Sequence, residues 1–157
     1  MTETGIRAMF RPEHIFPNIQ PSGTCCKDAL HTISRLLAEI CARDEKELYH
    51  GFLLREKMSG TAFGGGIAIP HARLPGDFPP VAIVVRLTHA IEWDAVDNVP
   101  VDTVIAFVTP EDVPDQYLEM LSAFARLLAH EEFCSGLKRI SSRDLIHQYI
   151  IQALEPG

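Results

Sequence analysis

The chain has 157 residues, of which 46% are hydrophobic and 22% charged, and its formal net charge at pH 7 is -7. This length and composition are typical of one globular domain with a single core, so we expect one domain over residues 1–157, with 1–12 as a flexible N-terminal segment. The acidic balance excludes a nucleic-acid binder, which needs a basic face, and no segment reaches the roughly 20 apolar residues that span a membrane.

The beginning of the chain predicts one short strand and two helices. Residues 14–19 are apolar but lie among prolines, which is typical of a brief edge strand at most. Between residues 27 and 42, apolar side chains recur at three- and four-residue steps and predict a helix. Asp44 can cap a second helix, with Glu47 completing a capping box, and this helix should end near Gly60. No secretion signal precedes these elements, so we expect a cytoplasmic protein.

The middle of the chain is rich in β-forming residues. Residues 60–76 contain five glycines and two prolines, which predicts a structured loop with room for one strand. The β-branched runs 81–87 and 101–108 are bounded by prolines and predict central strands. Between them, 91–93 can form a short strand and 97–98 a turn.

The last third of the chain is helical in pattern. An apolar stripe over 117–128 predicts a long helix, followed by a short segment at 132–139 and a final helix over 142–154. Helices thus lie on both sides of the β-rich middle in sequence. We therefore expect the α/β class: a three-layer α/β/α domain with a small mixed β-sheet flanked by helices.

A histidine after a glycine-rich stretch is the first candidate for chemistry. His71 follows Gly64, Gly65 and Gly66, whose backbone freedom allows peptide N–H groups to point at an anion. Pro70 stiffens the backbone that enters His71. A neutral imidazole can be a nucleophile near pH 7, so His71 is a candidate acceptor of a phosphoryl group, and a surface or structural histidine is the ordinary alternative. The lysine of a Walker A loop and the third glycine of a dinucleotide fingerprint are both missing here.

Four further residues are candidates for binding. Arg55 and Arg73 can supply positive charge to a phosphoryl group, and Thr61 a hydroxyl donor. Phe63 can belong to an apolar rim for a docking partner. Each also has an ordinary alternative: a cation at a helix end for Arg55, a solvated charge for Arg73, a turn hydroxyl for Thr61 and core packing for Phe63.

The other histidines show no metal-ligand spacing such as HExxH. We expect no metal and no cofactor.

Together these residues resemble the active-site signature of the IIA domains of the bacterial phosphoenolpyruvate-dependent phosphotransferase system, in the fructose–mannitol superfamily. The resemblance rests on an Arg-Glu pair at 55–56, Thr61, the run Gly66-Ile67-Ala68-Ile69-Pro70-His71, and Arg73. Residues 91–102 are similar to the segment typical of the nitrogen-regulatory branch, often called PtsN, and the free-standing length also favours this branch. The resemblance implies a cytoplasmic phosphocarrier that receives its phosphoryl group from an HPr-type phosphohistidine protein.

The resemblance also leaves alternatives open. Many members carry a second active-site histidine where this chain has Tyr117, and Ala72 stands where glycine is usual. A phenol can donate a hydrogen bond but supplies no charge near neutrality. The chain can therefore be a phosphotransferase component, a binding module that keeps the IIA fold without transfer, or a fructose/mannitol-type sugar-transport subunit. The implied partners are the HPr-type carrier and either regulatory target proteins or a IIB domain.

Overall fold

The computed structural model describes residues 10–21, 23–58, 60–93 and 98–154. Most of the segment 1–12 and the first residue of the turn predicted at 97–98 lie outside the described residues. The elements, in chain order, are η1 (Pro12–His14), β1 (Ile15–Ile19), α2 (Cys26–Cys41), α3 (Glu45–Met58), β2 (Ala62–Gly64), β3 (Ile67–Ala68), β4 (His71–Leu74), β5 (Val81–Ile91), β6 (Val101–Pro110), α4 (Pro114–Leu128), α5 (Glu131–Arg139) and α6 (Arg143–Leu154).

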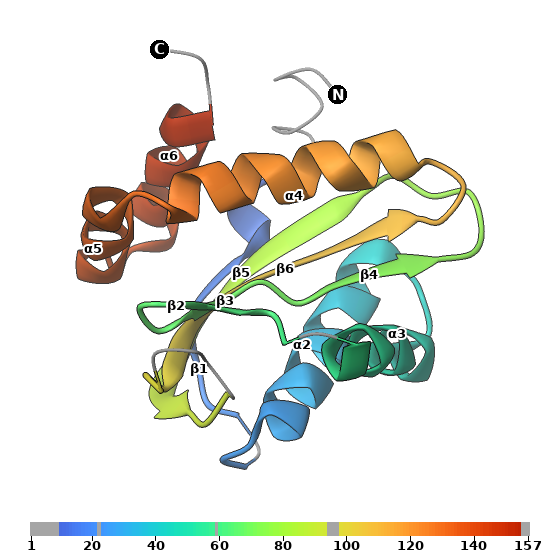
Figure 1. Cartoon of the computed structure of the whole chain (residues 1–157), viewed down its shortest axis with the longest axis horizontal. Helices are drawn as coiled ribbons and strands as arrows, with labels where there is room; N and C mark the ends of the chain where they lie inside the picture. The colour runs from blue at the N-terminus through green and yellow to red at the C-terminus, as the bar shows by residue number, and fades with distance from the viewer. Residues whose placement is uncertain (1–9, 22, 59, 94–97, 155–157) are drawn as a thin grey trace.

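A mixed sheet forms the middle layer, and helices cover both of its faces (Figure 1). This confirms the predicted α/β class. The strand order is β1-β5-β6-β3-β2, and β4 also pairs with β6. The long strands β5 and β6 lie at the centre, as predicted from their β-branched sequences, and they are antiparallel to each other. The edge strand β1 runs parallel to β5, whereas β3 and β4 both run parallel to β6.

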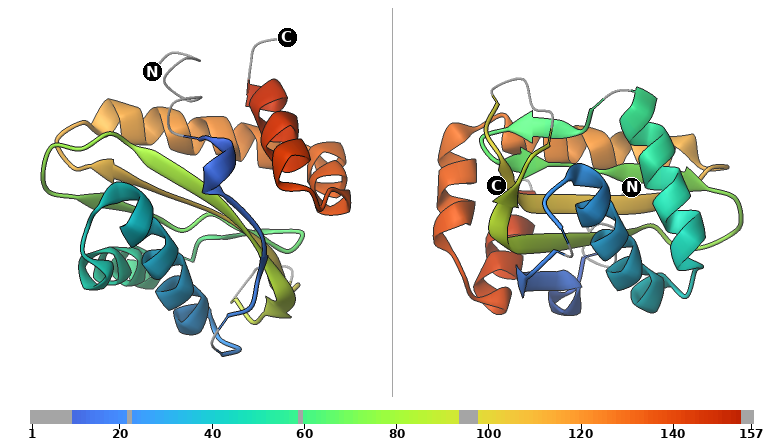
Figure 2. Two further views of the ribbon diagram at one scale, coloured as in Figure 1. Left: turned by 180° about the vertical axis from the view of Figure 1, so that it is seen from behind. Right: turned by 90° about the horizontal axis from the view of Figure 1, so that it is seen from below.

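The two faces of β5 contribute to two different cores, because successive side chains in a strand point to opposite sides. Ile83 and Val85 pack with the buried side chains of α2 and α3. Ala82 and Val84 pack with those of α4, α5 and α6. Figure 2 shows α2 and α3 together on one face of the sheet, with α5 and α6 at the far end of the other. No described helix is long and apolar enough to cross a membrane.

The segment 60–76 differs from its prediction as a loop with at most one strand. It forms three strands, β2, β3 and β4, of two to four residues each. Positive φ angles at Gly64, Gly65 and Gly66 turn the chain between β2 and β3. Strands this short are held by pairing with other strands, β3 and β4 with β6 and β2 with β3, which the local sequence does not reveal.

The predicted helices are confirmed within a few residues of their expected bounds. The segment 91–93, predicted as a separate short strand, is instead partly an extension of β5, which runs on to Ile91 past an irregularity in its pairing with β6. Beyond it, Glu92 makes an isolated bridge to Cys25.

Candidate functional site

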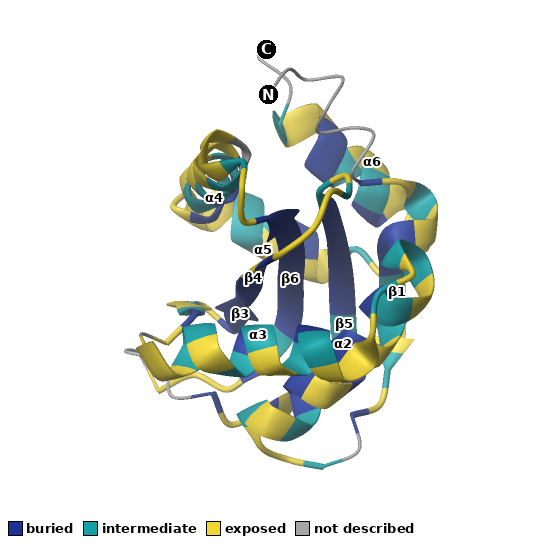
Figure 3. Cartoon of the chain, turned by 90° about the vertical axis from the view of Figure 1, so that its right-hand side faces the viewer, coloured by how far each residue is buried: buried dark blue, intermediate teal, exposed yellow. Residues whose placement is uncertain are grey.

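His71 begins β4 and lies where this strand meets β6. Its register partner on β6 is Phe107, and the two rings are stacked with centroids 5.1 Å apart and planes at 9°. The ring of Tyr117 from α4 lies 5.5 Å from the imidazole centroid, tilted by 53°. His71 is only 3% exposed, and Figure 3 shows β4 as a buried strand between α3 and α4. Contacts with these two rings therefore restrict the orientation of the imidazole.

Two hydrogen bonds define the tautomer of His71. Nδ1 lies 2.7 Å from the carbonyl oxygen of Ile69, which can only accept, so Nδ1 carries the proton. Arg55 Nε lies 3.0 Å from Nε2 and donates to it. Because a guanidinium has no acceptor, Nε2 must supply the lone pair. Both bonds thus agree on an imidazole protonated at Nδ1, with its nucleophilic nitrogen at Nε2.

The surroundings of His71 also keep it neutral. Burial of the ring lowers the pKa of His71 from 6.5 to about 4. The hydrogen bond to Ile69 opposes this shift, and the positive charge of Arg55 adds to it. At pH 7 the imidazole is therefore a base with an available lone pair, which is the form that nucleophilic catalysis requires.

A pocket of about 300 Å³ opens beside His71 between α3, β4 and α4. Its described lining residues include two arginines and no acidic side chain, so the pocket favours an anion. They are Gly51, Leu54, Arg55, Met58, His71, Ala72, Arg73 and Tyr117. The structure therefore brings together four of the sequence-predicted site residues: His71, Arg55, Arg73 and Tyr117.

Arg73 lies two residues after His71 on β4, as predicted from the alternation of a strand. Its guanidinium carbon lies 5.2 Å from the centroid of the Tyr117 ring. The same guanidinium donates a 2.8 Å hydrogen bond from Nη2 to the carbonyl oxygen of Glu111. Arg73 is exposed but has two defined contacts at the pocket.

Thr61 is not among the described residues that line this pocket, and its polar groups bond to other partners. Its hydroxyl donates a hydrogen bond to Glu56 Oε1, and its backbone N–H donates one of 2.8 Å to Oε2 of the same carboxylate. Thr61 O in turn accepts a hydrogen bond from the N–H of Ile69. These bonds connect the end of α3 to the segment that leads into His71. Glu56 was quoted in the sequence signature without a role, and the structure shows it as the acceptor for Thr61.

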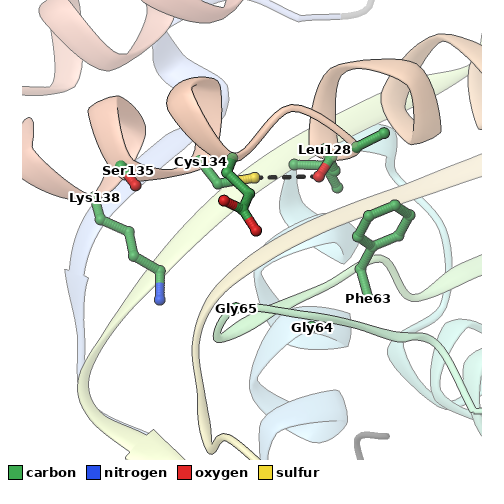
Figure 4. A pocket seen from close by; sticks show the side chains of 9 residues that line it. Phe63, Gly64, Gly65, Leu128, Cys134, Ser135 and Lys138 are labelled. Atoms are coloured by element: carbon green, nitrogen blue, oxygen red, sulfur yellow. Dashed lines mark hydrogen bonds between the residues drawn. The ribbon is translucent and has the colours of Figure 1, made fainter. Parts of the chain in front are cut away.

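Phe63, Gly64 and Gly65 line a second pocket, of about 480 Å³, at the opposite end of the same segment (Figure 4). The other described lining residues come from the α4–α5 corner: Leu128, Ala129, Glu131, Cys134, Ser135 and Lys138. The neighbouring Gly66 is so close to Lys138 that a Cβ there would collide with the ammonium group. The glycine-rich turn, whose N–H groups were expected to be able to point at an anion, is not among the described residues that line the pocket of His71. Its glycines form the β2–β3 turn, and two of them, Gly64 and Gly65, line the second pocket together with Phe63.

Gly51 on α3 was not expected to contribute to the site. A Cβ at this position would lie 3.1 Å from Ala72 Cβ and 3.1 Å from Leu74 Cδ2, so glycine allows α3 to approach β4 closely. This approach brings Arg55, one turn later on α3, within reach of His71. A glycine in the middle of a predicted helix was the available signal.

Comparison with known proteins gives the family of this chain. Residues 8–153 match the family described as Phosphoenolpyruvate-dependent sugar phosphotransferase system, EIIA 2. Over 125 residues, 79% of this chain and 77% of the relative, the chain is 38% identical to a nitrogen regulatory protein of Escherichia coli (strain K12).

Solved structures share the fold. The crystal structure of Nitrogen Regulatory Protein IIA-Ntr from Neisseria meningitidis matches with a TM-score of 0.85 at 23% identity, over 95% of this chain and 99% of that chain. Enzyme IIAMTL of Escherichia coli, solved in complex with phosphorylated enzyme IIBMTL, matches with a TM-score of 0.71 at 15% identity, over 89% of this chain and 95% of that chain. Since the family match spans nearly the whole chain and a relative at 38% identity covers most of it, this protein belongs to the EIIA 2 family of the phosphoenolpyruvate-dependent sugar phosphotransferase system.

Proposed function

We propose that this protein is a phosphocarrier in which His71 accepts a phosphoryl group from an HPr-type phosphohistidine protein and passes it on. The observation that carries this proposal is the imidazole of His71, which is neutral, protonated at Nδ1 and supplied with a lone pair at Nε2 beside two arginines. The family match supports the same chemistry, because the family belongs to a phosphotransferase system.

The transfer is a displacement at phosphorus. The lone pair of His71 Nε2 attacks the phosphorus of the donor's phosphohistidine, and a new N–P bond forms as the donor's N–P bond breaks. The electron pair of the broken bond returns to the donor imidazole. The proton on His71 Nδ1 stays in place, hydrogen-bonded to Ile69 O. No proton transfer to or from His71 is therefore needed.

Arg55 has two successive roles in this proposal. In the resting protein its Nε donates to the Nε2 lone pair, and this bond must break before the attack. The guanidinium can then donate to the oxygens of the transferred phosphoryl group, with which it forms charge-assisted hydrogen bonds. Phosphoryl transfer depends chiefly on such positioning and charge stabilisation.

The surface around the pocket supports docking of another protein. Leu54 and Met58 line the pocket and are 65% and 77% exposed, and Leu118, next to Tyr117, is 56% exposed. Exposed apolar side chains around a reactive group are typical contacts of a protein partner. We propose that the phosphoryl donor covers these three residues. The cytoplasmic location expected from the sequence stays a prediction.

A nitrogen-regulatory role is the part of the proposal that rests on relatives. The 38% identical Escherichia coli relative is named a nitrogen regulatory protein, and the charge added to His71 would be the signal read by target proteins. The alternative is a sugar-transport role with transfer to a IIB domain, which the complex of enzyme IIAMTL with phosphorylated enzyme IIBMTL illustrates for that protein. A binding module without transfer is the second alternative, motivated by Tyr117 and Ala72.

Incubation with phosphoenolpyruvate, enzyme I and HPr tests the proposal, with incorporation of an acid-labile phosphoryl label as the readout. The intact protein should be labelled and His71→Ala should not. His89→Ala is a matched control, because His89 is exposed on β5 and is not among the described residues that line the pocket. Label that persists in His71→Ala would overturn the assignment of His71. An unlabelled intact protein would instead favour the binding module.

A further inference from the structure

Arg73, Tyr117 and His71 form a row of contacts across the mouth of the pocket. The Arg73 guanidinium lies over one ring, 5.2 Å from the Tyr117 centroid, and that ring lies 5.5 Å from the imidazole of His71. The three residues come from two elements, since His71 and Arg73 are on β4 and Tyr117 is on α4. The phenol ring is thus the contact that connects the second arginine of the pocket to the reacting histidine.

The contact with the ring restricts the Arg73 side chain, which is exposed. An exposed arginine samples many rotamers, and ordering it around a phosphoryl group costs conformational entropy. Two contacts already restrict this guanidinium in the resting protein: the face of the Tyr117 ring and the carbonyl oxygen of Glu111. Both leave part of its fork of five N–H donors available for an anion.

The position of Arg73 complements that of Arg55. Arg55 reaches Nε2 from α3. Arg73 lines the same pocket from β4, where it contacts Tyr117 of α4. A phosphoryl group on Nε2 carries its negative charge on three oxygens, so one guanidinium cannot contact all of them in bidentate geometry. Among the described residues that line the pocket, Arg55 and Arg73 are the cations available.

We propose that Tyr117 is a positioning residue that holds the Arg73 guanidinium at the mouth of the pocket, where Arg73 is the second cation to contact the transferred phosphoryl group. This inference rests on the proposed phosphoryl transfer to His71. The face of an aromatic ring attracts a cation through its quadrupole, and this attraction does not require the hydroxyl. A phenylalanine at position 117 should therefore keep the contact with Arg73, whereas an aliphatic residue should lose it.

A double-mutant cycle tests the inference. The rate of phosphoryl transfer from phosphorylated HPr is measured against donor concentration for Arg73→Gln, Tyr117→Leu, Tyr117→Phe and the double variant Arg73→Gln/Tyr117→Leu. Arg126→Gln is the matched control, since Arg126 is exposed on α4 and is not among the described residues that line the pocket. Thermal unfolding of every variant verifies that each is folded.

The expected result is a saturating rate about tenfold lower in Arg73→Gln, the loss of one charge-assisted contact. Tyr117→Leu should lose a similar factor, and the double variant should be no slower than Arg73→Gln. Tyr117→Phe should recover most of the rate that Tyr117→Leu loses, and Arg126→Gln should transfer at the rate of the intact protein. The donor concentration at half-maximal rate should change little, because the lost contact is to the phosphoryl group and not to the docking surface.

Two results would overturn the inference while leaving the proposed function intact. One is a double variant whose loss is the product of the two single losses, which would show that Tyr117 acts without Arg73. The other is an unchanged saturating rate in Arg73→Gln. An intact protein that takes no label would defeat the proposed function, and this inference with it.

Discussion

His71 has a protonation state that depends on a backbone carbonyl two residues earlier. Ile69 O accepts from Nδ1, and the pyrrolidine of Pro70 between them fixes the backbone that makes this contact. The hydrogen bond leaves Nε2 as the nitrogen that reacts. A buried neutral imidazole of this kind also has a consequence for stability, because it resists protonation in the folded state.

Acid should destabilise the protein through His71. The folded-state pKa is lowered from 6.5 to about 4, so between these two pH values the unfolded chain binds a proton that the folded protein excludes. The stability that comes from the neutral ring is complete above pH 6.5 and is lost as the pH falls towards 4. By linkage the loss amounts to roughly 3 kcal/mol.

Chemical unfolding at pH 7, 6, 5 and 4 checks this expectation, with His71→Gln as the comparison. The free energy of unfolding of the intact protein should fall more steeply than that of the variant as the pH is lowered. Parallel curves would mean that His71 titrates normally.

Helix α3 contributes to the site through one close approach. Gly51 allows the helix to lie against Ala72 and Leu74 of β4, and Arg55 follows one turn later. A side chain at position 51 would push the helix away from the strand, because the Cβ of Ala72 belongs to a paired strand and cannot rotate aside.

We expect Gly51→Val to lower the free energy of unfolding by about 1–3 kcal/mol, the usual range for overpacking. It should also slow phosphoryl transfer, since the displaced helix carries the arginine that contacts His71. Lys46→Val places the same side chain at an exposed position of α3 and should have a smaller effect on both quantities. Equal losses in the two variants would show that valine disturbs the helix itself and not its contact with β4.

The proposed docking surface assigns the exposed apolar side chains on α3 and α4 to binding of the phosphoryl donor and not to the chemical step. Leu54→Ser and Met58→Ser should each raise the donor concentration for half-maximal transfer by roughly tenfold, which corresponds to about 1.4 kcal/mol. The saturating rate should stay the same. Leu145→Ser is the matched control, because Leu145 on α6 is 55% exposed but is not among the described residues of the His71 pocket. A control that weakens docking as much as Leu54→Ser would argue against this surface.

Across the whole molecule, the elements with strong local patterns were predictable. The periodic helices and the β-branched strands β5 and β6 were found in the sequence because burial on one or both faces determines their composition. Strands β2, β3 and β4 were not, since two to four residues carry little pattern and the pairing of β3 and β4 with β6 is a long-range contact. The sequence showed that Gly64, Gly65 and Gly66 free the backbone but not which pocket their turn lines, because the φ angles and partners of a turn depend on the strands that it connects.

The candidate site was predictable chiefly where its residues form a local motif, as His71, Pro70 and Arg73 do. Arg55 was a candidate through its charge, and the resemblance to a known family added Tyr117. Contacts between separate elements could not be predicted from the sequence. The stacking of Arg73 on Tyr117 and the close approach at Gly51 join residues far apart along the chain, so they follow from the packing of β4 with α4 and α3.

The assignment of phosphoryl transfer to His71 Nε2 is tested most directly by the ¹⁵N spectrum of the histidine-labelled protein at pH 7, before and after phosphorylation by phosphorylated HPr. Before phosphorylation, His71 should show a protonated Nδ1 and an unprotonated Nε2, as its bonds to Ile69 and Arg55 require. Afterwards, Nε2 should be bonded to phosphorus and Nδ1 should keep its proton. A phosphoryl group on Nδ1, on another histidine, or on none of them would contradict this account.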